Sequence, residues 1–432
     1  MEEKKVKKMI KANNPEMKSW LEVDSLSDFP IQNIPFGIIS SEKLKPRAAT
    51  RIGDFVIDLY VLAENGYFDD LGFDARTVFG QPYLNDFIAL GKPVWRSLRE
   101  RISDIFNDED NDIVIKERLI RKILLDIDTV QMHLPVKVGD YTDFYSSIEH
   151  ATNVGTMFRD PENALLPNWK HIPIGYHGRS SSIVISGTDI HRPKGQVKDK
   201  DKELPEFGPT KLLDFELEMA FITGKQTQLG TSIRTAKAED HIFGFVLFND
   251  LSARDIQTWE YVPLGPFLSK SFGSVVSPWI ITLDALEPFK VKGPVQDPKV
   301  LPYLEFEGNK NFDIQLEVFL QPKEGEPSRI CVSNFKYLYW NICQQLAHQT
   351  ISGCNINVGD MYASGTISGP TPDSYGSMLE LSWRGSKPIT LSDGSTRKFI
   401  NDFDAIIMKG FAKKDGLRIG FGESRTMILP AI

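Results

Sequence analysis

The sequence predicts a mostly β, α+β protein made of a small N-terminal domain and a larger, β-rich second domain. The chain has 432 residues, too many for one small core, and this favours two domains of roughly 100–200 residues each. Helical patterning is strongest over residues 94–128, in two pieces separated by the acidic "NDEDND". After residues 128–135, short β-rich runs alternate with turns rich in Gly, Pro, Asn and Asp, a pattern typical of mostly β domains.

The N-terminal part begins with a polar stretch that we expect to be loose. Further on, the β-rich run Phe55, Val56 and Ile57 gives way to a helical pattern that ends at Gly66. The change of composition at Pro135 and Gly139 marks the expected boundary. The expected divisions are a polar extension over 1–25, an N-terminal domain over 26–130 and a second domain over 131–432.

Strands in the second domain are expected wherever β-rich residues fall between turn residues. The expected runs are "HIPIGYHGRSSSIVISG", "KLLDFELEMAFITG", "HIFGFVLFND", "SPWIITLDAL", "FDIQLEVFLQ", "SMLELSWRG" and "DAIIMKGFA".

Composition and charge exclude several classes of protein. Fifty basic residues against fifty-eight acidic ones give a net charge of −8, which argues against a nucleic-acid partner. No run of about 18 apolar residues predicts a membrane span, and the basic start lacks the apolar region of a secretory signal. The three cysteines, Cys331, Cys343 and Cys354, lack metal-site spacing, so we expect reduced thiols in a cytoplasmic protein.

The segment "LLDFELEMAF" carries the strongest chemical signal. In a strand, Glu216 and Glu218 point to the same side, about 7 Å apart, with Asp214 on that face too. Two carboxylates that close repel unless a positive charge lies between them. One interpretation is a hard cation such as Mg²⁺ or Ca²⁺, and the other is a solvent-facing acidic edge.

A second carboxylate ends the next apolar run. Ile242 to Phe248 resembles a buried strand, and Asn249 and Asp250 follow it directly. A buried strand holds a carboxylate at its end rigidly, which suits a binding site, although Asp250 is equally compatible with a turn.

The segment "LSARDIQTWEYVPLGP" is expected to form a short helix capped by Ser252 and stopped by Pro263. Arg254, Gln257 and Tyr261 then share one face and offer hydrogen-bond donors to carboxylate or carbonyl oxygens. A solvated helix face remains the alternative interpretation.

Further polar residues complete the candidate set. "YTDFYSSIEH" places Asp143, Tyr145 and His150 within ten positions, and Lys270 lies in an irregular, Gly-flanked stretch. In "SMLELSW" we expect a strand with Glu380 opposite its leucine neighbours. No P-loop, dinucleotide fingerprint, G-x-S-x-G or H-E-x-x-H motif occurs, so ATP, NAD, serine-hydrolase and zinc-protease chemistry is not expected.

Taken together, five blocks resemble the fumarylacetoacetase family, in fixed order and from residue 27 nearly to the C-terminus. The blocks are "MHLPVKVGDYTDFYSSIEHATNVGTMFR", "LPNWKHIPIGYHGRSSSIVISG", "LLDFELEMAF", "FGFVLFNDLSARDIQTWEYVPLGPFLSKSFG" and "ASGTISG…SYGSMLELSW". The resemblance implies an N-terminal SH3-like barrel, a β-roll catalytic domain and a homodimer.

The resemblance also implies a role for each candidate residue. Residues that bind a divalent cation, Ca²⁺ or Mg²⁺, match Asp143, Glu216, Glu218 and Asp250. His150 matches the general base, Glu380 the carboxylate that orients it, and the groups around the oxyanion match Arg254, Gln257 and Lys270. Substrate contacts match Tyr145, Arg159, Tyr176, Gln257, Tyr261 and Thr366. A second cation is expected near Lys270 and Ser274, where the family usually has threonine at the latter position.

The implied reaction is the metal-dependent hydrolysis of a C–C bond in 4-fumarylacetoacetate, a β-diketo acid. It yields fumarate and acetoacetate in the last step of tyrosine and phenylalanine catabolism. The alternatives are an acylpyruvate hydrolase or oxo-acid decarboxylase of the same superfamily, and a non-catalytic binding or scaffold protein on the same fold. A decarboxylase needs no water-activating dyad, so His150 and Glu380 favour the hydrolase.

Overall fold

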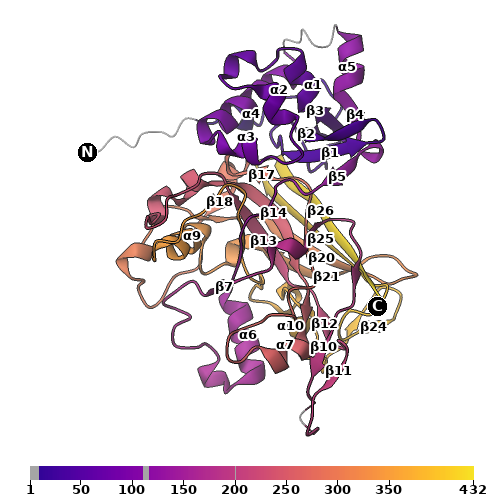
Figure 1. Cartoon of the computed structure of the whole chain (residues 1–432), viewed down its shortest axis with the longest axis vertical. Helices are drawn as coiled ribbons and strands as arrows, with labels where there is room; N and C mark the ends of the chain where they lie inside the picture. Colours follow the sequence, from indigo (N-terminus) through magenta and orange to yellow (C-terminus); the bar gives the residue numbers. More distant parts are fainter. Residues whose placement is uncertain (1–8, 110–115, 200) are drawn as a thin grey trace.

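The computed structural model describes residues 9–109, 116–199 and 201–432. Figure 1 shows an N-terminal unit of one sheet and several helices seated on a larger β-rich unit. The N-terminal sheet is antiparallel, with strand order β4-β3-β2-β1-β5. Its strands are β1 (Gly37–Ser41), β2 (Leu44–Ile52), β3 (Phe55–Asp58), β4 (Leu124–Asp126) and β5 (Gln131–His133). Its helices are α1 (Leu59–Glu64), α2 (Ala75–Phe79), α3 (Asn85–Ala89), α4 (Lys92–Phe106) and α5 (Glu117–Ile123).

An eight-stranded mixed sheet forms the centre of the second domain, in the order β7-β6-β22-β13-β14-β16-β8, with β17 also paired to β14. Its strands are β6 (Tyr141–Phe144), β7 (Gly175–His177), β8 (Ile183–Ile185), β13 (Leu217–Thr223), β14 (Ile242–Asp250), β16 (Ser274–Val276), β17 (Ile281–Thr282) and β22 (Met361–Ala363).

A second, five-stranded sheet packs beside it, in the order β21-β20-β25-β26-β9. Its strands are β9 (Ile190–His191), β20 (Gln315–Gln321), β21 (Ser328–Asn334), β25 (Ala405–Lys414) and β26 (Leu417–Leu429). Further strand pairs lie outside these sheets: β10 (Lys194–Val197) with β11 (Glu206–Pro209), β12 (Leu213–Asp214) with β15 (Ser252–Ala253), β18 (Lys290–Val291) with β19 (Asn311–Phe312), and β23 (Ile389–Thr390) with β24 (Thr396–Arg397). The helices of this domain are α6 (Ile148–Phe158), α7 (Arg254–Glu260), α8 (Leu283–Leu286), α9 (Ile342–Thr350) and α10 (Met378–Leu381).

The central sheet is buried on both faces, which explains the continuous apolar run of β14. Phe245 and Leu247 pack in the core shared with the five-stranded sheet. Phe243 and Val246 pack with Phe36 of the N-terminal unit. A strand covered on both sides shows no polar alternation, so an unbroken apolar sequence is what burial requires. The N-terminal unit and one face of the central sheet therefore share a hydrophobic cluster.

Several local expectations are wrong. The expected strand around Glu380 is the helical turn α10, because Ser377 caps it by accepting a hydrogen bond from the Glu380 amide. "LLDFELEMAF" is not one strand but two, β12 and β13, separated at Phe215 and Glu216. Ser252 lies in β15 and does not cap α7, whose first residue follows Ala253 and has no side-chain cap.

The polar extension is packed rather than loose over the part that the structure describes, residues 9–25. Ala12 and Leu21 are buried there, and the Trp20 ring stacks on Phe106 of α4 at 5.5 Å. Residues 1–8 lie outside the described part.

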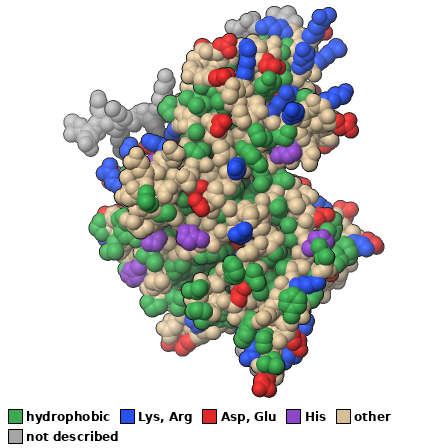
Figure 2. All heavy atoms as spheres, viewed as in Figure 1, with side chains coloured by type: hydrophobic (Ala, Val, Ile, Leu, Met, Phe, Trp, Pro, Cys, Tyr) green, Lys and Arg blue, Asp and Glu red, His purple; other side chains and the backbone are tan. Residues whose placement is uncertain are grey.

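The surface and the cysteines fit a globular chain. On the face shown in Figure 2, basic and acidic side chains are interspersed over the upper, N-terminal part. The three cysteines are free thiols, as expected. In the described residues, no helix has the length and apolar character needed to cross a membrane.

Candidate active site and metal centre

A cavity of about 520 Å³ opens where α6, α7 and the edge of the central sheet meet. Eleven of the candidate residues line it: Asp143, Tyr145, His150, Arg159, Tyr176, Glu216, Arg254, Gln257, Tyr261, Lys270 and Thr366. The other four, Glu218, Asp250, Ser274 and Glu380, are buried and do not line it. The fold thus brings residues from position 143 to position 380 to one pocket and its supporting layer.

His150 and Glu380 form a buried pair, which we call the dyad. His150 is held on the first turn of α6, whose cap residue Ser147 accepts a hydrogen bond from the His150 amide at 3.2 Å. The Nδ1 atom of His150 lies 2.6 Å from an oxygen of Glu380, 230 residues further along the chain. The carboxylate fixes the ring orientation and leaves Nε2 as the nitrogen available in the pocket.

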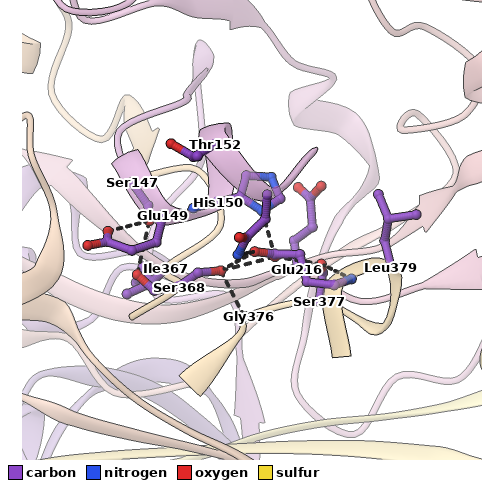
Figure 3. A network of polar contacts seen from close by, with 12 residues as sticks. Ser147, Glu149, His150, Thr152, Glu216, Ile367, Ser368, Gly376, Ser377 and Leu379 are labelled. Carbon is purple, nitrogen blue, oxygen red and sulfur yellow. Dashed lines mark hydrogen bonds and ion pairs between the residues drawn. The ribbon is translucent and has the colours of Figure 1, made fainter. Parts of the chain in front are cut away.

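Glu380 is saturated with donors. Besides His150, its oxygens accept hydrogen bonds from Asn153 at 2.9 Å, from Ser368 at 2.9 and 3.0 Å, and from Ser377 at 2.8 Å. Figure 3 shows His150 of α6 facing Ser368 and Ser377, which lie on the segment before α10. Burial by itself raises the pKa of Glu380, but His150 and the donors outweigh burial and hold the pKa below its usual value.

Sequence reasoning missed Asn153, Ser368 and Ser377, since each acts on Glu380 through a contact that no local pattern reveals. One signal was available for Ser377. Ser377 and Glu380 have the S-x-x-E spacing of a helix start, which predicts the turn of α10 in place of a strand.

Asp143, Glu216, Glu218 and Asp250 form a second buried group, the carboxylate cluster. One oxygen from each residue lies within 4.8 Å of the others. The sheet order β6-β22-β13-β14 explains this proximity. Asp143 pairs with Ala363 of β22, Glu218 is the second residue of β13, and Asp250 is the last residue of β14. The solvent-facing interpretation of Glu216 and Glu218 is therefore wrong, since both are buried.

Two members of the cluster have unsatisfied oxygens. Among the described residues, Asp143 Oδ1 and Glu218 Oε1 are buried without a hydrogen-bond partner. Burial and the neighbouring carboxylates raise the pKa of both groups well above normal. The other Glu218 oxygen accepts from the Gly365 amide at 3.0 Å, and Gly365 has φ +74° with no room for a Cβ atom beside the Phe144 carbonyl. Four convergent carboxylates, two of which have an unpartnered oxygen, fit a hard divalent cation.

The other two members are charge-paired. Lys270 Nζ lies 2.5 Å from Glu216 Oε2 and 2.6 Å from Asp250 Oδ2. Burial opposes the charged forms of all three groups. The ammonium nevertheless lowers the pKa of Glu216, and the carboxylates raise the pKa of Lys270, whereas burial prevails at Asp250 and raises its pKa. Ser274 Oγ donates to Asp250 Oδ1 at 2.8 Å, so Lys270 and Ser274 both contact the same carboxylate.

Arg254 extends the positive side of the pocket from α7. Its Nη1 lies 2.8 Å from Glu216 Oε1 and donates to Gln257 Oε1 at 3.1 Å. Its Nη2 is buried without a partner among the described residues. Arg254, Gln257 and Tyr261 all line the pocket, as their shared helix face predicts.

A buried histidine–carboxylate dyad of the kind that activates water, beside a cluster that fits a cation, is the arrangement of a metal-assisted hydrolytic site. Two family models match the chain: "fumarylacetoacetase N-terminal" over residues 32–135 and "fumarylacetoacetate (FAA) hydrolase C-terminal" over residues 141–421. The chain is 53% identical over 421 residues to the fumarylacetoacetase of Dictyostelium discoideum, covering 96% of this chain and 98% of that one. It is 50% identical over 416 residues to the human fumarylacetoacetase, with 96% and 99% covered. The chain belongs to the fumarylacetoacetase family.

A solved structure supports the fold. The fumarylacetoacetate hydrolase of the psychrophile Exiguobacterium antarcticum superposes with a TM-score of 0.51 at 16% identity, covering 92% of this chain and 99% of that one. At this identity the likeness concerns the fold alone.

Proposed function

We propose that this chain hydrolyses 4-fumarylacetoacetate to fumarate and acetoacetate, the last step of tyrosine and phenylalanine catabolism. The observation that carries the proposal is the His150–Glu380 pair in the pocket that also holds the carboxylate cluster. The relatives that share half of the sequence over nearly its whole length support the choice of substrate.

The residues suggest how the bond breaks. His150, oriented by Glu380, removes a proton from water, and the hydroxide adds to the carbonyl beside the fumaryl group. Arg254, Gln257 and Lys270 stabilise the resulting alkoxide, an effect of about 3 kcal/mol for a well-placed donor. The alkoxide then collapses to the fumarate carboxyl group, and the C–C bond breaks with its electron pair leaving on acetoacetate as an enolate. The proton that His150 took from water neutralises this carbanion. Tyr145, Arg159, Tyr176, Tyr261 and Thr366 contact the substrate from the pocket wall.

The carboxylate cluster would hold Ca²⁺ or Mg²⁺, which supplies Lewis-acid stabilisation of charge on the dicarbonyl oxygens. The unpartnered oxygens of Asp143 and Glu218 support this assignment. Lys270 and Ser274, both bound to Asp250, are the proposed neighbours of a second cation.

Further parts of the proposal concern the whole molecule. The N-terminal unit corresponds to the SH3-like barrel of the family, and the second domain to its β-roll. The divisions proposed are 1–25, 26–130 and 131–432. The protein acts as a cytoplasmic homodimer on a small-molecule substrate, with neither nucleic acid nor membrane as a partner.

Product analysis tests the function. Purified protein with Mg²⁺ or Ca²⁺ is incubated with 4-fumarylacetoacetate, and the products are quantified by chromatography. Fumarate and acetoacetate in equal amounts are expected. Pyruvate released from an acylpyruvate would instead indicate the acylpyruvate hydrolase, and CO₂ released from an oxo acid would indicate the decarboxylase. Lack of turnover of all three substrates by the metal-loaded protein would contradict an enzymatic role.

A further inference from the structure

Asp214 is a fully buried carboxylate at the end of β12 that does not line the pocket. It lies two residues before Glu216 but is not part of the carboxylate cluster. Its strand pairs with β15, which leads directly into α7, so Asp214 lies opposite Ser252. The break between β12 and β13 separates it from the strand that carries Glu218.

The two oxygens of Asp214 contact Arg254 and the backbone immediately before Glu380. Oδ2 accepts from Arg254 Nε at 2.8 Å. Oδ1 accepts from the Met378 amide at 2.6 Å, and Oδ2 also accepts from the Leu379 amide at 3.0 Å. Met378 and Leu379 are the two residues immediately before Glu380. One side chain therefore joins the guanidinium on α7 to the backbone that carries the dyad carboxylate.

These contacts fix the position of both groups. The Arg254 Nη1 atom is held by Glu216 and Gln257, so Asp214 supplies the contact that orients the guanidinium from its Nε side. α10 is a single four-residue turn, too short to hold its own geometry, so the two amide contacts add to the Ser377 cap in placing Glu380. Both oxygens of Asp214 act as acceptors, and together they accept from three donors.

We propose that Asp214 is a positioning residue that fixes Arg254 and Glu380 relative to each other. The general base held by Glu380 and the oxyanion donors then face the same substrate carbonyl. The inference rests on the proposed function for its kinetic consequence, while its structural consequence is independent of any substrate. Outer contacts of this kind typically change activity roughly 10–100-fold.

The test compares Asp214→Asn with Asp404→Asn. Asp404 is a matched control: it is equally buried, pairs with Arg397 at 2.7 and 2.9 Å, and accepts from the Asn401 amide at 2.9 Å, away from the pocket. Asp214→Asn keeps the side-chain shape but replaces one acceptor oxygen with an NH₂ group. This donor then faces at least one of the N–H groups that Asp214 now accepts from. We expect kcat to fall roughly 10–100-fold with little change in KM, whereas Asp404→Asn should lose thermal stability and keep kcat.

A substrate-free measurement separates this proposal from the proposed function. The His150 Nδ1 proton shared with Glu380 should give a downfield proton NMR signal, assigned by its loss in His150→Ala. Asp214→Asn should shift or broaden that signal, and Asp404→Asn should leave it in place. If wild type fails to hydrolyse 4-fumarylacetoacetate, the proposed function fails, and the NMR comparison still decides the role of Asp214.

An unchanged signal in folded Asp214→Asn would overturn the proposal, as would an unchanged kcat in an active enzyme. If Asp214→Asn yields no folded protein, Asp214→Glu takes its place. Glutamate keeps the charge and both acceptor oxygens but extends the side chain by one methylene. A shifted signal with reduced kcat supports the proposal, and a wild-type signal with wild-type kcat overturns it.

Discussion

The pocket joins two buried acidic centres whose surroundings are opposite. Glu380 of the dyad accepts hydrogen bonds from four side chains, and its pKa is lowered. In the carboxylate cluster, Asp143 and Glu218 each have an oxygen without a partner in the described part of the chain, and their pKa values are raised. Burying a charge is costly unless it is paired, so the first centre is complete by itself and the second requires an added positive charge.

Removing the divalent cation should have the largest effect on activity. Exhaustive chelation should abolish turnover of 4-fumarylacetoacetate, and Mg²⁺ or Ca²⁺ should restore it, because the cluster carries four carboxylates against Lys270 and Arg254. The measurement is the steady-state rate together with the metal content by elemental analysis. Full activity in protein verified as metal-free would contradict the assignment of the carboxylate cluster as a cation site.

Breaking the dyad should be next in size. His150→Ala should lower the chemical rate roughly 10²–10⁴-fold, the usual contribution of a general base. Glu380→Gln should lose much of the same factor, because a misoriented imidazole is a poor base.

The two losses should not add. The double variant His150→Ala with Glu380→Gln should be little slower than His150→Ala alone in single-turnover experiments. Circular dichroism and metal content serve as controls for folding and for the cation site. If the double variant instead shows the full product of the two losses, the residues act independently.

The two centres should respond to pH with opposite sign. For the cation-free protein, the raised pKa values of Asp143 and Glu218 mean that the folded state keeps protons that the unfolded state loses above about pH 4. Their contribution to the free energy of unfolding therefore falls as pH rises towards the raised pKa values. The lowered pKa of Glu380 gives stability that is present above about pH 4 and is lost as pH falls through the folded pKa.

Denaturant unfolding of the cation-free protein between pH 5 and 8 measures how the carboxylate cluster changes the free energy of unfolding with pH. Glu218→Gln should lose less stability with rising pH than wild type does, and Mg²⁺ or Ca²⁺ should stabilise wild type more as pH rises. Identical pH dependence in wild type and Glu218→Gln would show that Glu218 does not hold a proton in the folded state.

The smallest effect should come from removing one of the hydrogen-bond donors to Glu380 of the dyad. Ser368→Ala takes away one of several hydrogen bonds to Glu380, so about 1 kcal/mol of stability should be lost, with a drop in kcat of less than tenfold. Ser333→Ala is the matched control, because the buried Ser333 hydroxyl donates to the Ile367 carbonyl at 2.8 Å instead. Equal kcat values in the two variants would show that the hydrogen bond from Ser368 to Glu380 does not affect catalysis.

Local patterns in the sequence predicted part of the pocket. The unbroken apolar run of β14 placed Asp250 at the end of a buried strand, and the spacing of Glu216 and Glu218 predicted convergent carboxylates. The helical spacing of Arg254 and Gln257 predicted their shared face. These predictions depend on periodicity over a few residues, which a single sequence displays directly.

The pairing of His150 with Glu380 was inferred from the family resemblance, since no local pattern relates residues 230 positions apart. The sequence by itself determined which short segments carry carboxylates, donors and an imidazole on one face. Only the tertiary structure decided that Glu380 lies on a capped turn, that Asp214 joins that turn to Arg254, and that Glu380 is fully paired while Asp143 is not. The physical reason is that side-chain direction follows from local backbone geometry, whereas burial, partners and pKa depend on segments that only folding brings together.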